Sequence, residues 1–337
     1  MPQYLKRTRR TSGTLRKLVS CAFLATLIFV GRACLFRPGT AYPGTHFNQG
    51  TNAAWLGVEW VHAPHSEDEI AALAAELEQR QITTVYVFTS YRKAERVFNP
   101  SYDHAQDFVR ALKKYAPALN IQAWIGLPLQ YVDLADVDTR QEIAEFCVQV
   151  LQDAGFDGIH LDPEPIRSGN SYVLALLEET RAALGPGPIL SIATRRIWPF
   201  FPECQRCVSG RWGWSAEYYR QVADRVDEIA VMVYDSGQFH PALYRLWVKF
   251  QVINVTSALA DSEVTLFIGV PTSEETTRTH RPATENMRSG LQGLIDGLND
   301  SAAHPARVAG AALYPYWETD AEEWEDYHDL WLAPPPE

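Results

Sequence analysis

The stretch FDGIHLDPEP, residues 156–165, sets three polar side chains at alternate positions along an apolar run. Side chains alternate across a β-strand, so His160, Asp162 and Glu164 are expected on one face and the apolar residues on the other. Pro163 cannot donate to a sheet ladder, which indicates that the strand ends here. Acidic residues are rarely buried without a function, and α/β barrels carry their chemistry at the C-terminal ends of their strands. The stretch therefore predicts a functional site at the end of a buried strand.

Similar apolar runs, each followed by a helical pattern, recur along the chain. The strand-like runs cover residues 55–62, 83–90, 121–128, 156–164, 189–194, 228–234, 264–270 and 309–316. The helical patterns cover residues 66–79, 103–115, 139–153, 172–183, 215–226, 241–255, 285–298 and 321–332. Ser66 and Glu69 form a capping-box pattern at the start of the first helix. Eight such units predict an α/β fold, a (β/α)8 TIM barrel, as a single domain over residues 45–332 with a Pro-rich tail at 333–337.

The chain begins with a basic segment and then an apolar run. Residues 1–37 hold eight Lys and Arg residues and no acid, and residues 18–31 are an apolar run of 14. This pattern is typical of a secretory signal peptide or a signal anchor, and a run extended to residues 18–36 could hold the chain in a membrane. We therefore expect residues 1–44 to be an export segment with a linker, and the protein to be secreted or extracytoplasmic.

The charge of the remaining chain limits its partners. After Arg37 there are 22 basic against 41 acidic residues, a net charge of −19. Nucleic-acid binding requires a basic surface, so this composition argues against it. We expect a monomer.

The cysteines outside the export segment are a pair and a single residue. Cys204 and Cys207 form a lone C-x-x-C pattern, for which a local disulfide is favoured over half a zinc site or a redox pair. Cys147 falls on an apolar helix face and is expected to be a packed thiol.

The motif of residues 156–165 resembles the signature of glycoside hydrolase family 18, the chitinase-like TIM-barrel enzymes, which reads D-G-x-D-x-D-x-E. Asp157, Gly158, Asp162 and Glu164 match it, while His160 replaces the first aspartate of the family's D-x-D-x-E core. The chain is thus identified as a divergent member of this superfamily.

Two further segments resemble the family. Residues 232–235, Met-Val-Tyr-Asp, are similar to its M-x-Y-D motif at the sixth strand. At the eighth strand the family has a glycine and, four residues later, a tryptophan under the central sugar; from Gly310 this spacing leads to Tyr314, with Trp317 nearby. Residues 271–308 are too few for the insertion that deepens many chitinase clefts, which implies a shallower groove.

The resemblance implies a role for each candidate residue. Glu164 would be the general acid, and the 2-acetamido group of the substrate would attack the sugar in place of an enzyme carboxylate, so the reaction retains configuration. Asp162 and Tyr234 would orient that group, with Asp235 beside them. The aromatic residues that could stack on sugars include Trp60, Tyr314 and Trp317. The implied substrate is a glycan containing N-acetylglucosamine, and no cofactor is implied.

Several alternatives remain open from the residues alone. The barrel could be a weak or inactive carbohydrate-binding protein, or a hydrolase of other glycans in which Asp162 is a nucleophile or base. His160 is expected to lie one layer deeper and to bond Asp162; a metal site is disfavoured, because one strand spaces three such ligands too widely. Arg195 and Arg196 most simply form a solvated or salt-bridged loop, with contact to an acidic sugar or phosphate as the alternative.

Overall fold

The computed structural model describes residues 47–208, 210 and 212–333. The predicted export segment, residues 1–44, therefore lies outside the described residues, as does most of the predicted tail. Within the described part of the chain, no helix is both long and apolar enough to cross a membrane.

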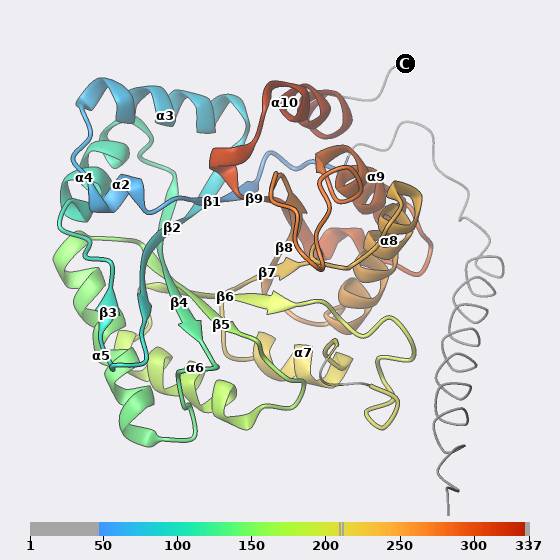
Figure 1. The fold of residues 1–337 in the computed structure, drawn as a ribbon, viewed down its shortest axis with the longest axis horizontal. Helices are drawn as coiled ribbons and strands as arrows, with labels where there is room; N and C mark the ends of the chain where they lie inside the picture. Colours follow the sequence, from blue (N-terminus) through green and yellow to red (C-terminus); the bar gives the residue numbers. More distant parts are fainter. Residues whose placement is uncertain (1–46, 209, 211, 334–337) are drawn as a thin grey trace, which may run out of the picture. The chain divides into compact units, whose positions relative to one another are not determined.

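Eight parallel strands form a closed barrel, which confirms the predicted fold (Figure 1). The strands are β1 Asn52–Leu56, β2 Ile82–Arg92, β4 Asn120–Pro128, β5 Gly158–Glu164, β6 Ile189–Arg195, β7 Glu228–Met232, β8 Thr265–Pro271 and β9 Val308–Tyr314. Pairing of β1 with both β2 and β9 closes the ring. The short β3, Phe98–Asn99, pairs antiparallel with the end of β2. All the strand ends that carry the candidate residues thus face the same side of the barrel.

Helices surround the barrel and bury its outer face (Figure 1). They are α2 Glu59–His62, α3 Glu67–Gln79, α4 Ala105–Tyr115, α5 Val137–Ala154, α6 Ser171–Leu184, α7 Ala216–Ala223, α8 Pro241–Ala258, α9 Met287–Leu298 and α10 Ala321–Tyr327. Short helical turns lie at Pro305–Arg307, Tyr316–Glu318 and His328–Leu332. The capping box predicted at Ser66 and Glu69 opens α3.

The first predicted strand, residues 55–62, was placed too far along the chain. β1 begins at Asn52 and ends at Leu56, and Glu59–His62 is the helical turn α2. The apolar residues of this segment belong to two elements: Val61 is buried from a helix, whereas all five residues of β1 are buried in the sheet. A continuous apolar run does not show where one element ends and the next begins.

The core has two layers, as expected for a barrel wrapped in helices. The larger layer lies between the strands and the helices. The smaller one fills the barrel itself and consists of Ala53, Trp55, Tyr86, Trp124, Ala230, Phe267 and Ala312. Four aromatic rings in this set project from β1, β2, β4 and β8, so the floor of any site above them is aromatic.

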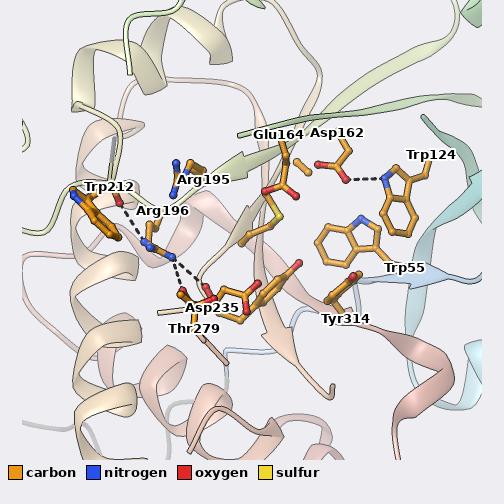
Figure 2. A pocket seen from close by; sticks show the side chains of 13 residues that line it. Trp55, Trp124, Asp162, Glu164, Arg195, Arg196, Trp212, Asp235, Thr279 and Tyr314 are labelled. Carbon is orange, nitrogen blue, oxygen red and sulfur yellow. Dashed lines mark hydrogen bonds between the residues drawn. The ribbon is translucent and has the colours of Figure 1, made fainter. Parts of the chain in front are cut away.

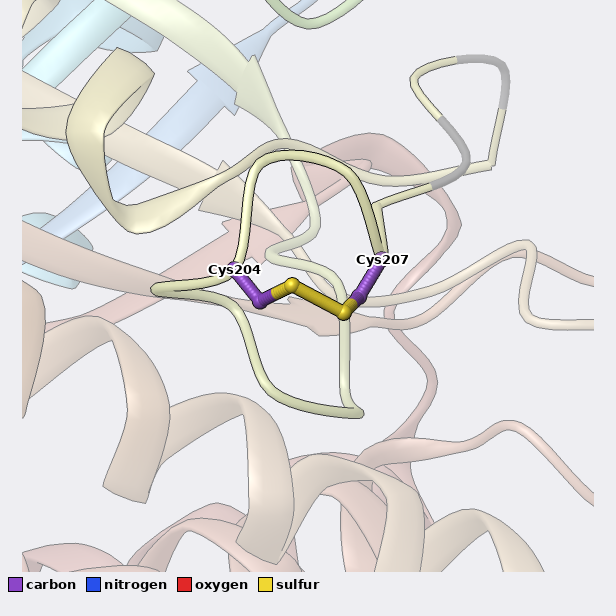
Figure 3. The surroundings of a disulfide bond; sticks show 2 residues. All are labelled: Cys204 and Cys207. Carbon is purple, nitrogen blue, oxygen red and sulfur yellow. A yellow bond between two sulfur atoms is a disulfide. The ribbon is translucent and has the colours of Figure 1, made fainter.

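A disulfide joins Cys204 to Cys207 in the loop between β6 and α7, with the two Cα atoms 5.2 Å apart (Figure 3). This confirms the preferred interpretation of the C-x-x-C pattern. Cys147 is a buried free thiol, also as predicted. The base of the same loop is fastened by backbone bonds, from Trp198 N to Trp214 O at 2.7 Å and from Trp214 N to Arg196 O at 3.0 Å.

Candidate active site

A cavity of about 260 Å³ opens at the C-terminal ends of the strands (Figure 2). Its lining comes from six of the eight barrel strands or the residues that follow them, together with two loops. The lining residues are Trp55, Trp124, Asp162, Glu164, Ala193, Arg195, Arg196, Trp212, Met232, Tyr234, Asp235, Thr279 and Tyr314. Five of the eight residues predicted for the site, Asp162, Glu164, Tyr234, Asp235 and Tyr314, are therefore brought together here.

Asp162 and Glu164 lie two residues apart on β5, and both point into the cavity (Figure 2). Asp162 Oδ2 accepts a hydrogen bond of 3.0 Å from Trp124 Nε1 on the neighbouring strand β4. Asp162 Oδ1 is buried without a hydrogen-bond partner among the described residues. A buried acceptor without a hydrogen bond destabilises the folded protein, so this oxygen is suited to accept a hydrogen bond from a ligand.

The two carboxyl groups favour their protonated forms. Burial raises the pKa of Asp162 well above its ordinary value, and the nearby charge of Glu164 raises it further against the opposing bond from Trp124. Glu164 keeps solvent contact through the cavity, yet the surrounding protein desolvates it and raises its pKa, helped by the charge of Asp235. Two such carboxyls resist ionising together, so the pair retains a proton that an acid catalyst could donate.

Tyr234 and Asp235 follow the end of β7 on another side of the cavity. The Tyr234 ring stacks on Tyr314 with 5.1 Å between centroids and 9° between planes. Burial raises the pKa of Tyr234 well above its ordinary value, so its hydroxyl stays protonated and can donate. Asp235 has a left-handed backbone, with φ of 53°. Such a conformation is uncommon for a residue other than glycine and is often found at functional sites.

The loop that carries Asp235 is held by a buried carboxylate that the sequence analysis missed. Glu285 accepts hydrogen bonds from the backbone and hydroxyl groups of Ser236, and its Oε2 lies 3.3 Å from His280 Nδ1. Glu285 is buried, and His280 is nearly so. The only sequence signal for this arrangement was the polar composition of residues 277–286, which is equally typical of an exposed loop.

Three aromatic rings form the floor. Trp55 is 1% exposed, and its ring meets Tyr314 edge to face at 5.7 Å between centroids. Tyr314 also lies 6.2 Å from Trp124. Trp55 was missed because the predicted strand began at it and so placed it at the N-terminal end of the strand. In the structure it is the next-to-last residue of β1, at the end that faces the cavity.

His160 lies one layer deeper, as predicted, but it bonds Trp55 and Ser191 instead of Asp162, and it does not line the cavity. It is fully buried one layer below, where its Nε2 accepts a hydrogen bond of 3.2 Å from Trp55 Nε1 and its Nδ1 lies 2.7 Å from Ser191 Oγ. Its ring stacks on Tyr86 at 3.8 Å. The reason is that residues i and i+2 of a strand point the same way but lie more than 6 Å apart, whereas side chains of neighbouring strands meet in the interior. Burial lowers the pKa of His160 well below its ordinary value, so the ring is neutral.

The bonds of His160 form an ordered chain across the barrel interior. An indole can only donate, so Nε2 of His160 accepts and its proton lies on Nδ1, which donates to Ser191. Ser191 Oγ then donates to Gln122 Oε1 at 2.5 Å, and Gln122 Nε2 donates to Glu228 Oε1 at 2.9 Å. His160 is thus a link that holds Trp55, not a substrate contact.

Trp60 and Trp317 lie away from the centre of the site. Trp60 belongs to α2 and packs against His65 and Phe108, at 4.5 and 5.5 Å, beside a separate cavity. The structure therefore does not place it at this site, because the segment it occupies is a helix outside the barrel. Trp317 is 48% exposed and meets Tyr314 edge to face at 6.3 Å, next to the cavity but not in its lining.

The polar lining of the cavity consists of carboxyl, phenol, hydroxyl, indole and guanidinium groups. Among the residues that the structure describes, no group of three His, Cys, Asp or Glu side chains is close enough to hold a metal ion. The chemistry available is that of two carboxyls, a phenol, an aromatic floor and two arginines.

The family profile described as "Glycosyl hydrolases family 18" matches residues 59–329. The chain therefore belongs to glycosyl hydrolase family 18, as its motifs suggested. No curated protein matches the sequence.

Solved structures of low sequence identity share the fold. A family GH18 chitinase from Cycas revoluta, in a complex with allosamidin, has a TM-score of 0.57 and 15% identity over 83% of this chain and 99% of its own. A chitinase from Bacteroides thetaiotaomicron has a TM-score of 0.52 and 13% identity over 82% and 93%. The spore cortex-lytic enzyme SleL from Bacillus cereus has a TM-score of 0.54 and 11% identity over 83% and 74%.

Proposed function

We propose that this protein is a retaining glycoside hydrolase that cleaves glycans containing N-acetylglucosamine by substrate-assisted catalysis. The observation that carries the proposal is the placement of Asp162 and Glu164 two residues apart at the end of β5, both with a raised pKa and both facing one cavity. The chitinases among the structures of similar fold support this substrate class.

Each step of the reaction has a residue suited to it. Glu164 donates its proton to the glycosidic oxygen while the 2-acetamido oxygen of the substrate attacks the anomeric carbon. Asp162 Oδ1, which has no hydrogen-bond partner among the described residues, accepts the N–H of the acetamido group, and the Tyr234 hydroxyl donates to its oxygen. Ionised Glu164 then takes a proton from the water that opens the oxazolinium intermediate. The aromatic floor of Trp55 and Tyr314 supports the sugar.

The place of action is also proposed. The basic and apolar start of the chain would direct export, with residues 18–36 as a possible membrane anchor, so that the barrel meets glycans outside the cytoplasm. Export also agrees with the disulfide between Cys204 and Cys207, since such bonds persist in oxidising compartments.

The test uses two changes and a matched control. Glu164→Gln keeps the shape of the acid but removes its proton, and is expected to lower kcat on an unactivated chitooligosaccharide at least a hundredfold. Asp162→Ala should weaken inhibition by a thiazoline analogue of N-acetylglucosamine. Glu325→Gln changes the same group on the exposed face of α10 and should match the unchanged protein. Near-normal turnover by Glu164→Gln would remove it as the acid, and activity confined to sugars without an acetamido group would exclude the mechanism.

One observation favours a second candidate, a barrel that binds glycans and cleaves them slowly. His160 occupies the place of a family carboxylate and bonds Trp55 and Ser191, so Glu164 is the one carboxyl group among the described residues whose charge acts on Asp162. Calorimetry measures binding of chitooligosaccharides, and the release of reducing ends measures their cleavage. Binding without such release would favour the binding protein.

A further inference from the structure

The wall of the cavity formed by the end of β6 carries two consecutive arginines, Arg195 and Arg196 (Figure 2). Arg196 is held by neutral acceptors: Nε donates to Trp212 O at 3.2 Å, and Nη1 donates to Asp235 O at 2.9 Å and to Tyr234 O at 3.5 Å. Among the described residues, no carboxylate forms an ion pair with it. Its positive charge therefore remains available to a ligand.

The guanidinium is fixed in place before any ligand arrives. Arginine has five N–H donors in a planar fork, and these three bonds use only Nε and Nη1. The Nη2 hydrogens have no partner among the described residues. The loop that supplies Trp212 O is fastened at its base, by the bond from Trp214 N to Arg196 O. A preorganised fork with spare donors suits a planar or tetrahedral anion.

Burial and a neighbouring cation both disfavour the charged form of Arg196. Burial lowers the pKa of Arg196, and the adjacent charge of Arg195 lowers it further, against weaker opposing effects from carboxylates that include Asp235. An anion bound to the Arg196 guanidinium would offset both effects.

The position of Glu164 indicates which part of the substrate meets this wall. Figure 2 shows Glu164 between the aromatic floor of Trp55 and Tyr314 on one side and Arg196 on the other. A general acid lies beside the glycosidic oxygen. If the sugar that is attacked rests over the aromatic floor, the leaving group lies on the arginine side.

We propose that the leaving-group side of the cavity is a subsite for an anionic group, a carboxylate or a phosphate, carried by the glycan next to the bond that is cleaved. This inference rests on the proposed function for the direction of the substrate. It makes the substrate an acidic glycan and not a neutral homopolymer of N-acetylglucosamine.

The test compares leaving groups that carry a neutral or an anionic substituent at the same position. The probes are 4-nitrophenyl chitobiosides with a carboxamide, a carboxylate or a phosphonate on the aryl ring, so that the two anionic compounds also distinguish the two chemistries. We expect kcat/KM for at least one anionic compound to exceed that for the carboxamide about tenfold, and this ratio to fall as salt is added. Equal values for all three at low salt would overturn the proposal.

Variants assign the effect to the arginine wall. Arg196→Gln should reduce the ratio of anionic to neutral kcat/KM close to one, and Arg196→Lys should restore part of it. Arg225→Gln removes the same charge near the opposite end of the barrel, where Arg225 pairs with Glu178, and should leave the ratio unchanged. A ratio that survives in Arg196→Gln, or that Arg225→Gln lowers equally, would overturn the assignment. If Arg196→Gln does not fold, the unchanged protein still tests the proposal. A ratio of anionic to neutral kcat/KM that does not fall as salt is added would overturn it.

Binding separates this proposal from the proposed function. Calorimetry with the same three compounds needs no turnover. Tighter binding of an anionic compound without hydrolysis would support the subsite and contradict the proposed hydrolase activity. Hydrolysis of all three compounds, with no preference for the anionic ones in binding or rate, would support the hydrolase and contradict the subsite.

Discussion

At the scale of single residues, period-two alternation was enough to put Asp162 and Glu164 on one face of β5. It was not enough to identify their partners. Trp124 bonds Asp162 because β4 and β5 pair with Gly126 beside Asp162, and this register is not encoded in either strand alone. The same limit explains why His160 was assigned to Asp162 and is found with Trp55, which is 105 residues away in the sequence.

Asp235 is expected to set the alkaline limit of activity. Its charge is the second cause, after burial, of the raised pKa of Glu164. Asp235→Asn removes that charge, so the pKa of Glu164 falls and the proton is lost at lower pH. The alkaline limb of the kcat/KM profile should therefore move to lower pH, whatever happens to the maximal rate. Asp107→Asn, an exposed change on α4, serves as the control. An unmoved or raised limb would contradict this account.

His160 should matter for stability more than its distance from the substrate suggests. His160→Ala leaves Trp55 Nε1 unpaired, removes the donor to Ser191 Oγ and opens a cavity beside Tyr86, which should lower the free energy of unfolding by about 2–4 kcal/mol. His160→Asn keeps one donor and one acceptor and should recover part of the loss. Urea unfolding of the three proteins measures this, and equal stability of all three would refute the role given to the hydrogen-bond chain.

At the scale of elements, the existence of strands and helices was predicted well and their ends less well. β1 was displaced because its apolar run continues into α2, while α9 begins at Met287, two residues after the predicted start, because Asn286 caps it. The least predictable segment was the β6–α7 loop. Its sequence predicted the disulfide. Nothing in the local sequence indicated that Trp212 would line the cavity and that its carbonyl oxygen would accept a hydrogen bond from Arg196.

Glu228, the first residue of β7, is a buried carboxyl group that makes the stability of the folded protein depend on pH. Burial raises the pKa of Glu228 to about 7, opposed by hydrogen bonds from Gln122 and Tyr86. Because the folded state holds the proton more tightly than the unfolded state, this stabilising contribution is complete below about pH 4.5 and is lost as the pH rises through 7.

Glu228→Gln isolates that contribution, since it cannot titrate. The unfolding free energy of the unchanged protein relative to Glu228→Gln should fall by about 3 kcal/mol between pH 4.5 and 8. Denaturant unfolding at several pH values measures the difference, with Glu325→Gln as a control on the surface. A difference that does not depend on pH would show that Glu228 keeps one protonation state throughout.

At the scale of the whole molecule, eight regular alternations of strand and helix predicted a closed barrel. They did not predict which bonds hold the first and last strands together. Asn52, at the start of β1, donates from Nδ2 to Asn48 Oδ1 and Gln81 O. Its Oδ1 accepts from Ala311 N in β9 at 3.1 Å and from Trp331 Nε1 at 2.7 Å. Asn52 is fully buried, so these bonds join the first strand, the last strand and the final helical turn in a site closed to water.

This closure predicts where the chain can be shortened. A protein that starts at residue 45 keeps Asn48 and Asn52 and should be soluble, melt in one cooperative transition and retain the activity of the full-length chain. A protein that starts at residue 53 lacks the acceptor of Trp331 and Ala311 and leaves two buried N–H groups unpaired, at a cost of about 1–3 kcal/mol each. It should melt at a clearly lower temperature or fail to fold. Because Asn52→Asp keeps an acceptor for both groups, it should lie between the two in melting temperature. If the chains starting at residues 45 and 53 melted alike, closure through Asn52 would not be what stabilises the barrel.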